Sequence, residues 1–347
     1  MNIDFNSQSG IAAEQPAFFK YFQPLMLTYQ NDFPPSTWFT APLLMYRRQQ
    51  MSKKVDEELS RLVQLKFDEV KRSERDFTDR SVLSLSLKGI DNLTPKLLEQ
   101  TGDQLKTFLF AGHDTTSTML QWAFYELSRT PRALDTLTKE LDTILGPETD
   151  PESIANILLN RGEDVLGKLA YTSAIIKEVL RLHPPGGSGR MVKPGKGFLL
   201  ETKSGSVEVD GVILYICHTL IHRDRAVYGD TADVFVPERW LGDTSTTAEE
   251  HSTGPQSDQA GSGIPKSAWR PFERGPRNCI GQELTNIEAR VVLAMTARRY
   301  DFIKVGLGAV ALKDGEPSLN EYGQWAVTGE LIEVSPIDWH NISPSNL

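Results

Sequence analysis

The sequence contains little cysteine, no long apolar runs and no excess of positive charge. Its 347 residues include only Cys217 and Cys279, so no disulfide framework is indicated. No stretch approaches the roughly 20 apolar residues that span a bilayer, and residues 1–13 lack the charged-then-apolar order of a signal peptide. The formal net charge is −9, without a basic arm or zinc-ligand spacing, which argues against a nucleic-acid-binding protein.

The overall composition is ordinary for a globular protein. Apolar residues make up 39% of the chain and charged residues 24%. The length suits one large domain or two of average size. Function therefore has to be inferred from local motifs.

Residues 272–281 contain the strongest chemical motif, in which Cys279 stands just before a helical pattern. The first N–H groups of a helix lack intrahelical partners and carry a positive partial charge, which favours a thiolate over a thiol. Gly275 and Gly281 let the backbone pass close to a flat ligand, and Arg277 offers a permanently charged fork to a carboxylate. These features together fit a site for haem iron.

The alternative for a single cysteine is a structural role. Most lone buried cysteines are small core residues, and we interpret Cys217 in that way because it lies in the apolar run 212–221. For Cys279, the choice between the two roles depends on the motif that surrounds it.

A second motif lies within a long helical pattern over residues 94–130. Pro95 near its start and Pro131 just beyond its end are expected at helix termini. Near its middle, residues 111–116 read Ala-Gly-His-Asp-Thr-Thr. The glycine costs a helix roughly 1 kcal/mol relative to alanine, and a threonine hydroxyl can bond backwards to a carbonyl and open the helix. An exposed polar patch is the alternative, which the apolar residues on both sides disfavour.

The histidine of this motif, His113, could suggest a metal site. Asp114 is the only other candidate ligand at a useful spacing. We therefore favour a histidine that binds no metal.

Glu178 and Arg181 lie three residues apart in a helical pattern over 169–182, so they share a helix face and can form an ion pair. Such pairs are common on exposed helices and carry little information alone. Later in the chain, the segment Pro237-Glu238-Arg239 supplies a second arginine.

The other periodic segments predict short helices and strands. Further helices are expected within 12–30 and over 49–72, 132–145, 150–159 and 283–298. Strands are expected over 198–200, 207–209, 212–216, 302–305 and 326–331, with Asp210-Gly211 as a hairpin turn. Residues 243–263, rich in Ser, Thr, Gly and Gln, predict a flexible surface insertion.

The motifs together resemble the cytochrome P450 family. All five fixed positions of its haem-binding signature, Phe-x-x-Gly-x-Arg-x-Cys-x-Gly, match residues 272–281, and this match favours the ligand role for Cys279. Residues 111–116 are similar to the family's oxygen-binding groove, and the Glu-x-x-Arg pair and the Pro-Glu-Arg segment follow in the family's order. The resemblance covers about residues 10–335.

The resemblance implies a fold that is mainly α with small β-sheets (α+β), a cytochrome P450 fold lacking its N-terminal helices. Full-length members have further helices upstream, so the chain is similar to the C-terminal two-thirds of such an enzyme, as a truncated gene product, an alternative start or a decayed copy. We expect one partial domain over 1–347. Its parts are roof helices and a linker (1–93), a long oxygen-groove helix (94–130), helices with the Glu-x-x-Arg pair and strands (131–242), a flexible insertion (243–268), and the cysteine loop, last helix and C-terminal strands (269–347).

The resemblance also implies residue roles. Cys279 would ligate haem iron as a thiolate, Thr115 would hydrogen-bond dioxygen and Asp114 would help to relay protons. Glu178, Arg181 and Arg239 would form a structural triad. The remaining cofactor contacts would be Phe272, Gly275, Arg277, Gly281 and Arg190. The substrate-pocket candidates are Phe108, Phe110, Ala111, Gly187 and Trp325.

The implied function is that of a fungal-type haem-thiolate monooxygenase. It would insert one oxygen atom from O₂ into a small apolar substrate, such as a lipid or a secondary metabolite. Electrons would come from an NADPH-cytochrome reductase or a similar donor, for which Lys266, Arg270, Arg274 and Arg290 provide a local positive surface. Family members of this type reside at the endoplasmic reticulum membrane, but without an anchor we expect a cytoplasmic or peripheral protein.

Two alternatives stay open. One is a non-catalytic truncated remnant that holds no haem. The other is a haem-dependent rearrangement or dehydration without O₂, which Asp114 and Thr115 disfavour because such chemistry needs no proton relay. The substrate, the reductase and the natural start of the chain are not specified by the sequence.

Overall fold

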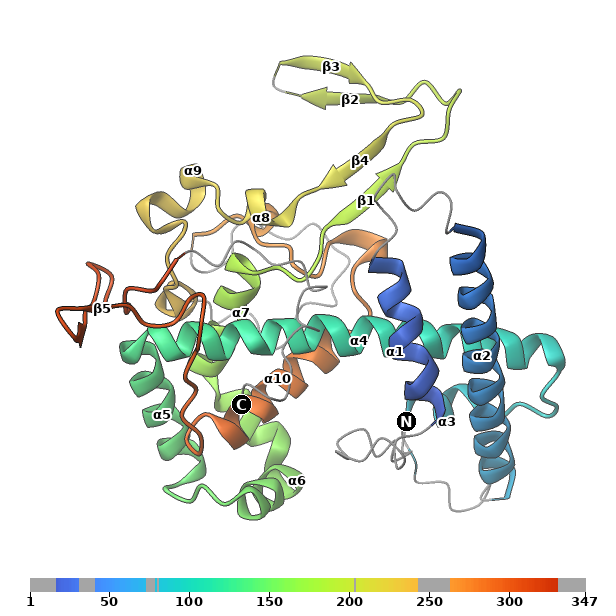
Figure 1. Cartoon of the computed structure of the whole chain (residues 1–347), viewed down its shortest axis with the longest axis horizontal. Coiled ribbons are helices and arrows are strands. Elements are labelled where there is room, and N and C mark those ends of the chain that lie inside the picture. The colour runs from blue at the N-terminus through green and yellow to red at the C-terminus, as the bar shows by residue number, and fades with distance from the viewer. Residues whose placement is uncertain are drawn as a thin grey trace. The chain divides into compact units, whose positions relative to one another are not determined.

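Helices carry most of the fold, and the strands in the described part of the chain pair in small two-stranded antiparallel sheets (Figure 1). The computed structural model describes residues 17–30, 41–72, 79, 81–202, 204–242 and 263–329. The chain divides into two compact units, residues 1–111 and 112–347. The sequence-based prediction of a mainly α fold with small β-sheets is therefore confirmed.

The first unit is helical and has its own core. Its elements are α1 (Ala17–Gln30), α2 (Ala41–Arg72), α3 (Val82–Leu87) and the first half of α4 (Pro95–Arg129). Apolar positions at helical spacing on α2 pack against α1 and α3. The core comprises Phe18, Leu25, Val55, Leu59, Leu62, Val63, Phe67, Leu83, Leu87 and Leu105. The helix predicted over 49–72 lies within α2, which begins eight residues earlier.

Helix α4 is helical throughout, from Pro95 to Arg129, in agreement with the pattern over 94–130. The structure describes a continuous helix through Gly112 and the residues that follow it. A penalty of roughly 1 kcal/mol for one glycine is small for a helix of 35 residues with packed apolar side chains.

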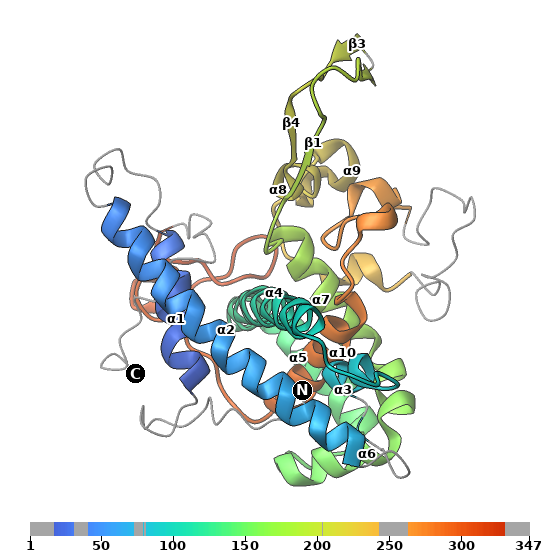
Figure 2. The same ribbon diagram turned by 90° about the vertical axis from the view of Figure 1, so that its right-hand side faces the viewer.

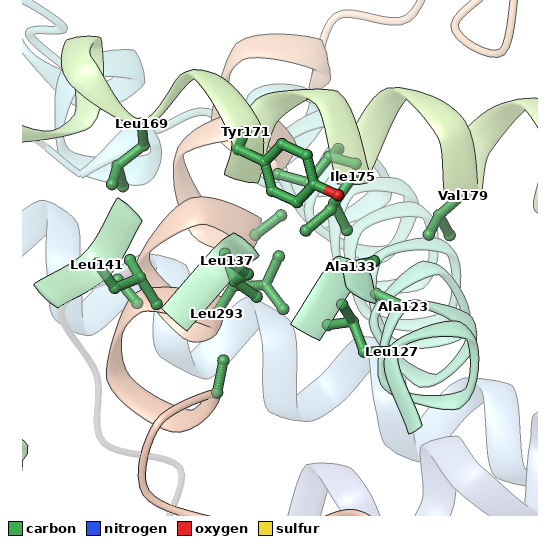
Figure 3. Packing of buried hydrophobic residues seen from close by; sticks show 14 of the residues in the cluster. Ala123, Leu127, Ala133, Leu137, Leu141, Leu169, Tyr171, Ile175, Val179 and Leu293 are labelled. Atoms are coloured by element: carbon green, nitrogen blue, oxygen red, sulfur yellow. The ribbon is translucent and has the colours of Figure 1, made fainter. Parts of the chain in front are cut away.

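The second unit is built around four helices that share one core (Figure 3). These are α5 (Pro131–Leu145), α6 (Pro151–Lys168), α7 (Ala170–Leu182) and α10 (Gln282–Thr296). Leu137 and Leu141 of α5, Ile175 of α7 and Leu293 of α10 are fully buried there, together with side chains from the second half of α4. Burial of each such side chain stabilises the fold by roughly 1.5–3 kcal/mol.

The start of α7 is capped by a neighbouring helix. Its N-cap residue, Leu169, provides no side-chain cap. Instead, the Glu140 carboxylate of α5 accepts the backbone N–H groups of Tyr171 and Thr172 at 2.5 and 2.8 Å. A carboxylate at this position also suits the positive end of the helix dipole, so α5 fixes the place where α7 begins.

Helix α6 is longer than predicted. Asp150 caps it by accepting the N–H of Ser153 at 3.1 Å, as the sequence suggests. The helix continues to Lys168 beyond a kink at Arg161, whose φ and ψ are −137° and 22°.

The strands extend away from the helices of the second unit (Figure 2). β1 (Ser188–Met191) pairs with β4 (Ile213–Ile216), and β2 (Leu199–Thr202) pairs with β3 (Gly205–Glu208). The expected hairpin at Asp210-Gly211 is therefore wrong, because β3 and β4 are not paired with each other. The Asp210 carboxylate instead accepts the backbone N–H groups of Gly195 and Lys196, which holds the chain between β1 and β2.

Short helical turns connect the strands to the cysteine loop. They are α8 (His218–Ile221), α9 (Arg225–Tyr228) and the 3-10 turns η2 (Gly229–Thr231), η3 (Pro237–Trp240), η5 (Lys266–Ala268) and η6 (Gly275–Arg277). Residues 243–262, the larger part of the predicted insertion, lie outside the described residues.

The C-terminal segment contains β5 (Leu312–Lys313) and β6 (Glu316–Pro317), which pair with each other. The predicted strand over 302–305 is absent, since this described segment forms no strand and Phe302 stacks on Phe124 of α4 at 4.0 Å between ring centroids. Of the strand predicted over 326–331, Val327 forms one bridge with Val310, while residues 330 and 331 lie outside the described residues.

Candidate functional site: a buried clamp and a cysteine loop

Glu178 on α7 is the centre of a buried polar cluster, which we call the clamp. Its side chain is 0% exposed. Oε1 accepts hydrogen bonds from Arg181 Nη2 (2.8 Å), Arg239 Nε (3.1 Å) and the backbone N–H of Val236 (2.9 Å). Oε2 accepts from Arg181 Nε (2.9 Å) and the Trp240 indole N–H (2.8 Å). Because a buried charge is tolerated only when it is paired and hydrogen-bonded, the clamp is internally complete.

Arg181 extends the clamp into the segment that follows β4. Its Nη1 donates to the carbonyls of His222 and Ala232, and its Nη2 donates to the carbonyl of Val234. The guanidinium also lies over the Tyr228 ring, 4.8 Å from the centroid. The three side chains of the predicted triad thus meet in the structure, and they hold the loops between residues 222 and 240 on α7.

His222 connects the clamp to the cysteine loop. Its carbonyl accepts from Arg181, while its ring Nε2 accepts the backbone N–H of Arg270 at 2.9 Å. Burial of the ring, together with the neighbouring His218, lowers the pKa of His222 from 6.5 to about 4. The ring is therefore neutral at physiological pH, as an acceptor for Arg270 requires.

The cysteine loop runs from Phe272 to Gly281 and is closed at its base by a backbone hydrogen bond. The N–H of Cys279 donates to the carbonyl of Phe272 at 2.8 Å, and the Phe272 ring packs against the core of the second unit. The 3-10 turn η6 forms the tip of the loop. Gly275, at the start of η6, has a φ of +77°, where a side chain would be strained. Cys279 is exposed at the end of the loop, and α10 begins directly after it.

The surroundings of Cys279 fit a flat cofactor that bears carboxylates. A Cβ added at Gly281 would lie 3.8 Å from the Cys279 sulfur, and a Cβ at Gly275 would meet no atom within 4 Å. Arg274 and Arg277 are exposed and have no ion-pair or hydrogen-bond partner in the described part of the chain. A thiolate is a soft ligand suited to iron, and unpaired guanidinium groups bind carboxylates. The groups in this loop therefore fit haem.

The structure shows no multi-residue metal cluster in its described part. Within the described ranges, no group of three or more His, Cys, Asp or Glu side chains could hold a metal ion. His113 Nδ1 lies 2.8 Å from Asp114 Oδ1, so this histidine pairs with its neighbour. A metal held here would depend on Cys279 as its protein ligand.

The α4 motif is more exposed than the sequence suggests. The Asp114 side chain is 43% exposed and Thr115 is exposed, and residues 110–113 also lie on the surface. The expectation that flanking apolar residues would keep this motif from the surface is therefore wrong for 110–113. Burial begins at Thr116, directly after Thr115. The Thr116 hydroxyl is buried without a partner among the described residues.

The pocket candidates do not lie in one unit. Phe108 and Phe110 are 40% and 51% exposed, and they belong with Ala111 to the first unit. Trp325 belongs to the second unit, and its backbone N–H donates to the carbonyl of Arg129 at 2.7 Å, at the C-terminal end of α4. That end is about 21 Å along the helix from Thr115, at 1.5 Å per residue.

Gly187 is required for a close contact that the sequence does not reveal. A Cβ at this position would lie 2.1 Å from the hydroxyl of Tyr215. Tyr215 belongs to β4, and Gly187 stands just before its partner strand β1. Glycine here allows the tyrosine to lie against the backbone, and the pocket role of Gly187 stays a prediction.

Glu273 is the main site residue that sequence reasoning missed. Its Oε1 accepts from Arg270 Nε at 2.8 Å and from His218 Nε2 at 3.3 Å, and its Oε2 accepts from Arg190 Nη2 at 3.1 Å. Burial alone would raise the pKa of Glu273, but these hydrogen bonds and charges hold it below its ordinary value. The only signal in the sequence is a carboxylate among the arginines of the loop, which does not indicate its partners from β1 and α8.

The hollow at the surface of α6 is not part of this site. It is lined only by consecutive residues, Leu159 to Asp164, and coincides with the kink at Arg161. It is local to the bent helix and contains neither the cysteine loop nor the α4 motif.

The fold and the loop define a mainly α protein with a single exposed cysteine in a glycine- and arginine-containing loop before a helix. A profile of the cytochrome P450 family matches residues 2–320. The chain belongs to the cytochrome P450 family.

Two fungal relatives are similar to the chain over somewhat more than half its length. Cytochrome P450 monooxygenase acrF of Aspergillus aculeatus is 39% identical over 201 residues, which cover 58% of this chain and 40% of the relative. Cytochrome P450 monooxygenase polC of Polytolypa hystricis is 34% identical over 209 residues, which cover 60% of this chain and 34% of the relative. The match thus spans less than half of each of these relatives.

A third relative combines two functions in one protein. The bifunctional cytochrome P450/NADPH–P450 reductase of Gibberella moniliformis is 34% identical over 207 residues, 59% of this chain and 16% of the relative. None of the helices that the structure describes in this chain is long and apolar enough to cross a membrane.

Proposed function

We propose that the chain provides the haem-binding part of a monooxygenase that inserts one oxygen atom from O₂ into a small apolar substrate. The observation that carries the proposal is the closed cysteine loop. The signature is complete and its Cys279 is exposed, and the loop is anchored by the Phe272–Cys279 hydrogen bond. When bound, haem would supply the one-electron and O₂ chemistry that amino-acid side chains cannot perform.

The residues of the loop have distinct parts in this proposal. Cys279 ligates the iron as a thiolate. Gly281 keeps the backbone free of a side chain beside the sulfur, and Gly275 keeps the tip of the loop free of one. Arg277 and Arg190 bind the cofactor carboxylates through charge-assisted hydrogen bonds, and Phe272 anchors the loop to the core.

The α4 motif supplies protons in this proposal. Insertion of one oxygen atom consumes O₂, two electrons and two protons and releases one water for each substrate oxidised. Asp114 is partly exposed and can exchange protons with solvent, and Thr115, next in the helix, passes them on. The family resemblance assigns these roles to Asp114 and Thr115. They also suit the chemistry, because delivery of protons requires groups that can hold and release them.

The electron donor is a reductase in this proposal. The relative from Gibberella moniliformis, whose name combines a cytochrome P450 with an NADPH–P450 reductase, supports a donor of that kind. The arginines of the loop would suit an acidic docking partner. The two relatives named cytochrome P450 monooxygenases support a reaction of this kind. We further propose a small substrate from secondary metabolism and a cytoplasmic or peripheral location.

Carbon monoxide binding to the reduced protein tests the proposal. The full chain is purified with haem, reduced, and its absorbance is recorded with carbon monoxide. We expect the strongly red-shifted Soret band that a thiolate ligand gives. Absence of haem absorbance would contradict the proposal and favour the non-catalytic remnant.

Matched variants assign the ligand and the relay. Cys279→Ser is expected to abolish the shifted band, whereas Cys217→Ser, the other cysteine, should keep it. Thr115→Ala should also keep the band but yield less product per electron consumed. A shifted band in Cys279→Ser would refute the ligand assignment.

A further inference from the structure

The Glu273 carboxylate accepts hydrogen bonds from three parts of the second unit. Arg270 lies just before the cysteine loop, His218 belongs to α8 and Arg190 belongs to β1. The Glu273 side chain is only 10% exposed. A carboxylate with so little solvent contact is held by its partners, so it fixes their positions as much as they fix its own.

The backbone of Glu273 indicates that this arrangement is enforced. Its φ is +59°, in the left-handed region that non-glycine residues rarely adopt. Such a conformation costs on the order of 1–3 kcal/mol and persists only where surrounding contacts determine it. The position directly follows Phe272, which anchors the loop in the core. The conformation therefore points the Glu273 carboxylate from the base of the cysteine loop toward β1.

His218 connects the Glu273 carboxylate to the segment that follows α7. Its Nδ1 lies 2.7 Å from the carbonyl of Gly186, and its Nε2 lies 3.3 Å from Glu273 Oε1. The side chain is 3% exposed, and this buried link holds Glu273 from the side opposite to solvent.

Some N–H groups of the Arg190 guanidinium donate hydrogen bonds within the protein, and others do not. Its Nη1 donates to Ser188 Oγ (2.6 Å) and to the Gly189 carbonyl (2.9 Å), and its Nη2 donates to Glu273. A guanidinium has five N–H donors, so two of them have no acceptor among the described residues. The side chain is 42% exposed. Arg190 is thus fixed in orientation while keeping donors for another carboxylate.

We propose that Glu273 is a positioning residue that holds the Arg190 guanidinium beside the cysteine loop, ready to bind a carboxylate of the cofactor. The inference rests on the proposed function, because it needs haem at Cys279. Fixing a long side chain in its binding orientation before the ligand arrives removes an ordering cost from binding. Residues that orient a direct contact in this way commonly change affinity by about tenfold when replaced.

Hemin titration of the full chain tests the inference. Absorbance at the Soret band gives the affinity of the wild type and of Glu273→Gln, Arg190→Gln and the double variant. We expect Glu273→Gln to weaken hemin binding about tenfold. The double variant should bind as Arg190→Gln does, because Glu273 acts through Arg190.

Hemin dimethyl ester, whose carboxylates are blocked, is the matched probe. All variants should bind the ester with wild-type affinity, since no carboxylate is left for Arg190. If Glu273→Gln weakened binding of the ester as much as that of hemin, its role would be structural and the inference would fail. Unchanged or tighter binding of hemin by Glu273→Gln would also overturn it.

Two further controls keep the outcomes distinct. Should Glu273→Gln fail to fold by circular dichroism, Glu273→Asp keeps the charge and shortens the reach by one methylene, and it is expected to show the same weakening with hemin alone. A wild type that binds hemin while Glu273 variants behave identically to it refutes only the inference. A wild type that binds no hemin refutes the proposed function and the inference with it.

Discussion

The clamp around Glu178 and the outer part of the cysteine loop, residues 274–279, differ in how their charged groups are partnered, although His222 joins the clamp to the base of the loop. In the clamp, the side chains of Glu178 and Arg181 are both 0% exposed, and the carboxylate accepts five hydrogen bonds from this chain. In the loop, Arg277 and Cys279 are exposed. Arg277 has no partner within the described segments.

This difference separates the groups that stabilise the fold from those that are available to a ligand. A buried charge that loses its partner is costly, because neither water nor another group replaces the interaction. An exposed charge is solvated and contributes little to stability. The clamp should therefore respond to mutation through the free energy of unfolding, and the loop through binding.

Removal of the clamp carboxylate should have the largest effect. Glu178→Ala leaves the buried guanidinium of Arg181 without its ion-pair partner, and we expect a loss of about 3–5 kcal/mol in the free energy of unfolding. That is a large fraction of the stability of an ordinary domain. Urea unfolding followed by circular dichroism measures the change.

An exposed glutamate provides the control for this experiment. Glu163 lies on the surface of α6, and Glu163→Ala should change the free energy of unfolding by no more than about 0.5 kcal/mol. A loss below about 1 kcal/mol in Glu178→Ala would mean that the clamp is not a stabilising unit, and the comparison with the loop would lose its basis.

The sequence predicts the clamp better than the surroundings of the loop, for a physical reason. Glu178 and Arg181 are three residues apart on one helix, so helical periodicity places them together before any tertiary contact is known. The helices of the second unit were likewise predictable from apolar spacing and, for α5 and α6, from proline at their first turns. Strand pairing was not, because β1 and β4 are separated by the β2–β3 hairpin, and local propensity does not specify such a partner.

The partners of Glu273 could not be predicted from the sequence either. Its contacts with His218 and Arg190 link residues 55 and 83 positions apart. They depend on how α8 and β1 fold back toward the cysteine loop. The exposure of residues 110–113 was missed for a similar reason, since apolar neighbours along a helix face different directions and do not bury the positions between them.

His222 should give the next largest effect, and it is pH-dependent. Its pKa is about 4 in the folded state and 6.5 ordinarily, so the unfolded chain takes up a proton between these values that the folded chain does not. The stability from this group is present above pH 6.5 and is lost as the pH falls toward 4. The full loss is on the order of 3 kcal/mol at 1.36 kcal/mol per unit of pKa.

A variant that cannot be protonated isolates this contribution. The amide of His222→Gln can still accept the Arg270 N–H but has no comparable titration. Urea unfolding of both proteins at pH 7 and at pH 4.5 should show a smaller pH-dependent loss in the variant, by about 2–3 kcal/mol. Equal losses in the two proteins would show that His222 is not the titrating link between the clamp and the loop.

Arg277 should give the smallest effect on stability and thereby mark the other side of the comparison. It is exposed and unpaired among the residues described, as is Arg274 three positions earlier, so the two arginines form a matched pair. We expect Arg277→Gln and Arg274→Gln each to change the free energy of unfolding by no more than about 0.5 kcal/mol. Arg277→Gln alone should weaken hemin binding, by roughly tenfold, which corresponds to about 1.4 kcal/mol.

Equal weakening by both substitutions would indicate a general attraction between a basic loop and an anionic cofactor, and would contradict a specific contact from Arg277. Added salt would screen such a general attraction. Destabilisation by Arg277→Gln on the scale expected for Glu178→Ala would instead place this arginine with the clamp and remove the distinction between the two regions.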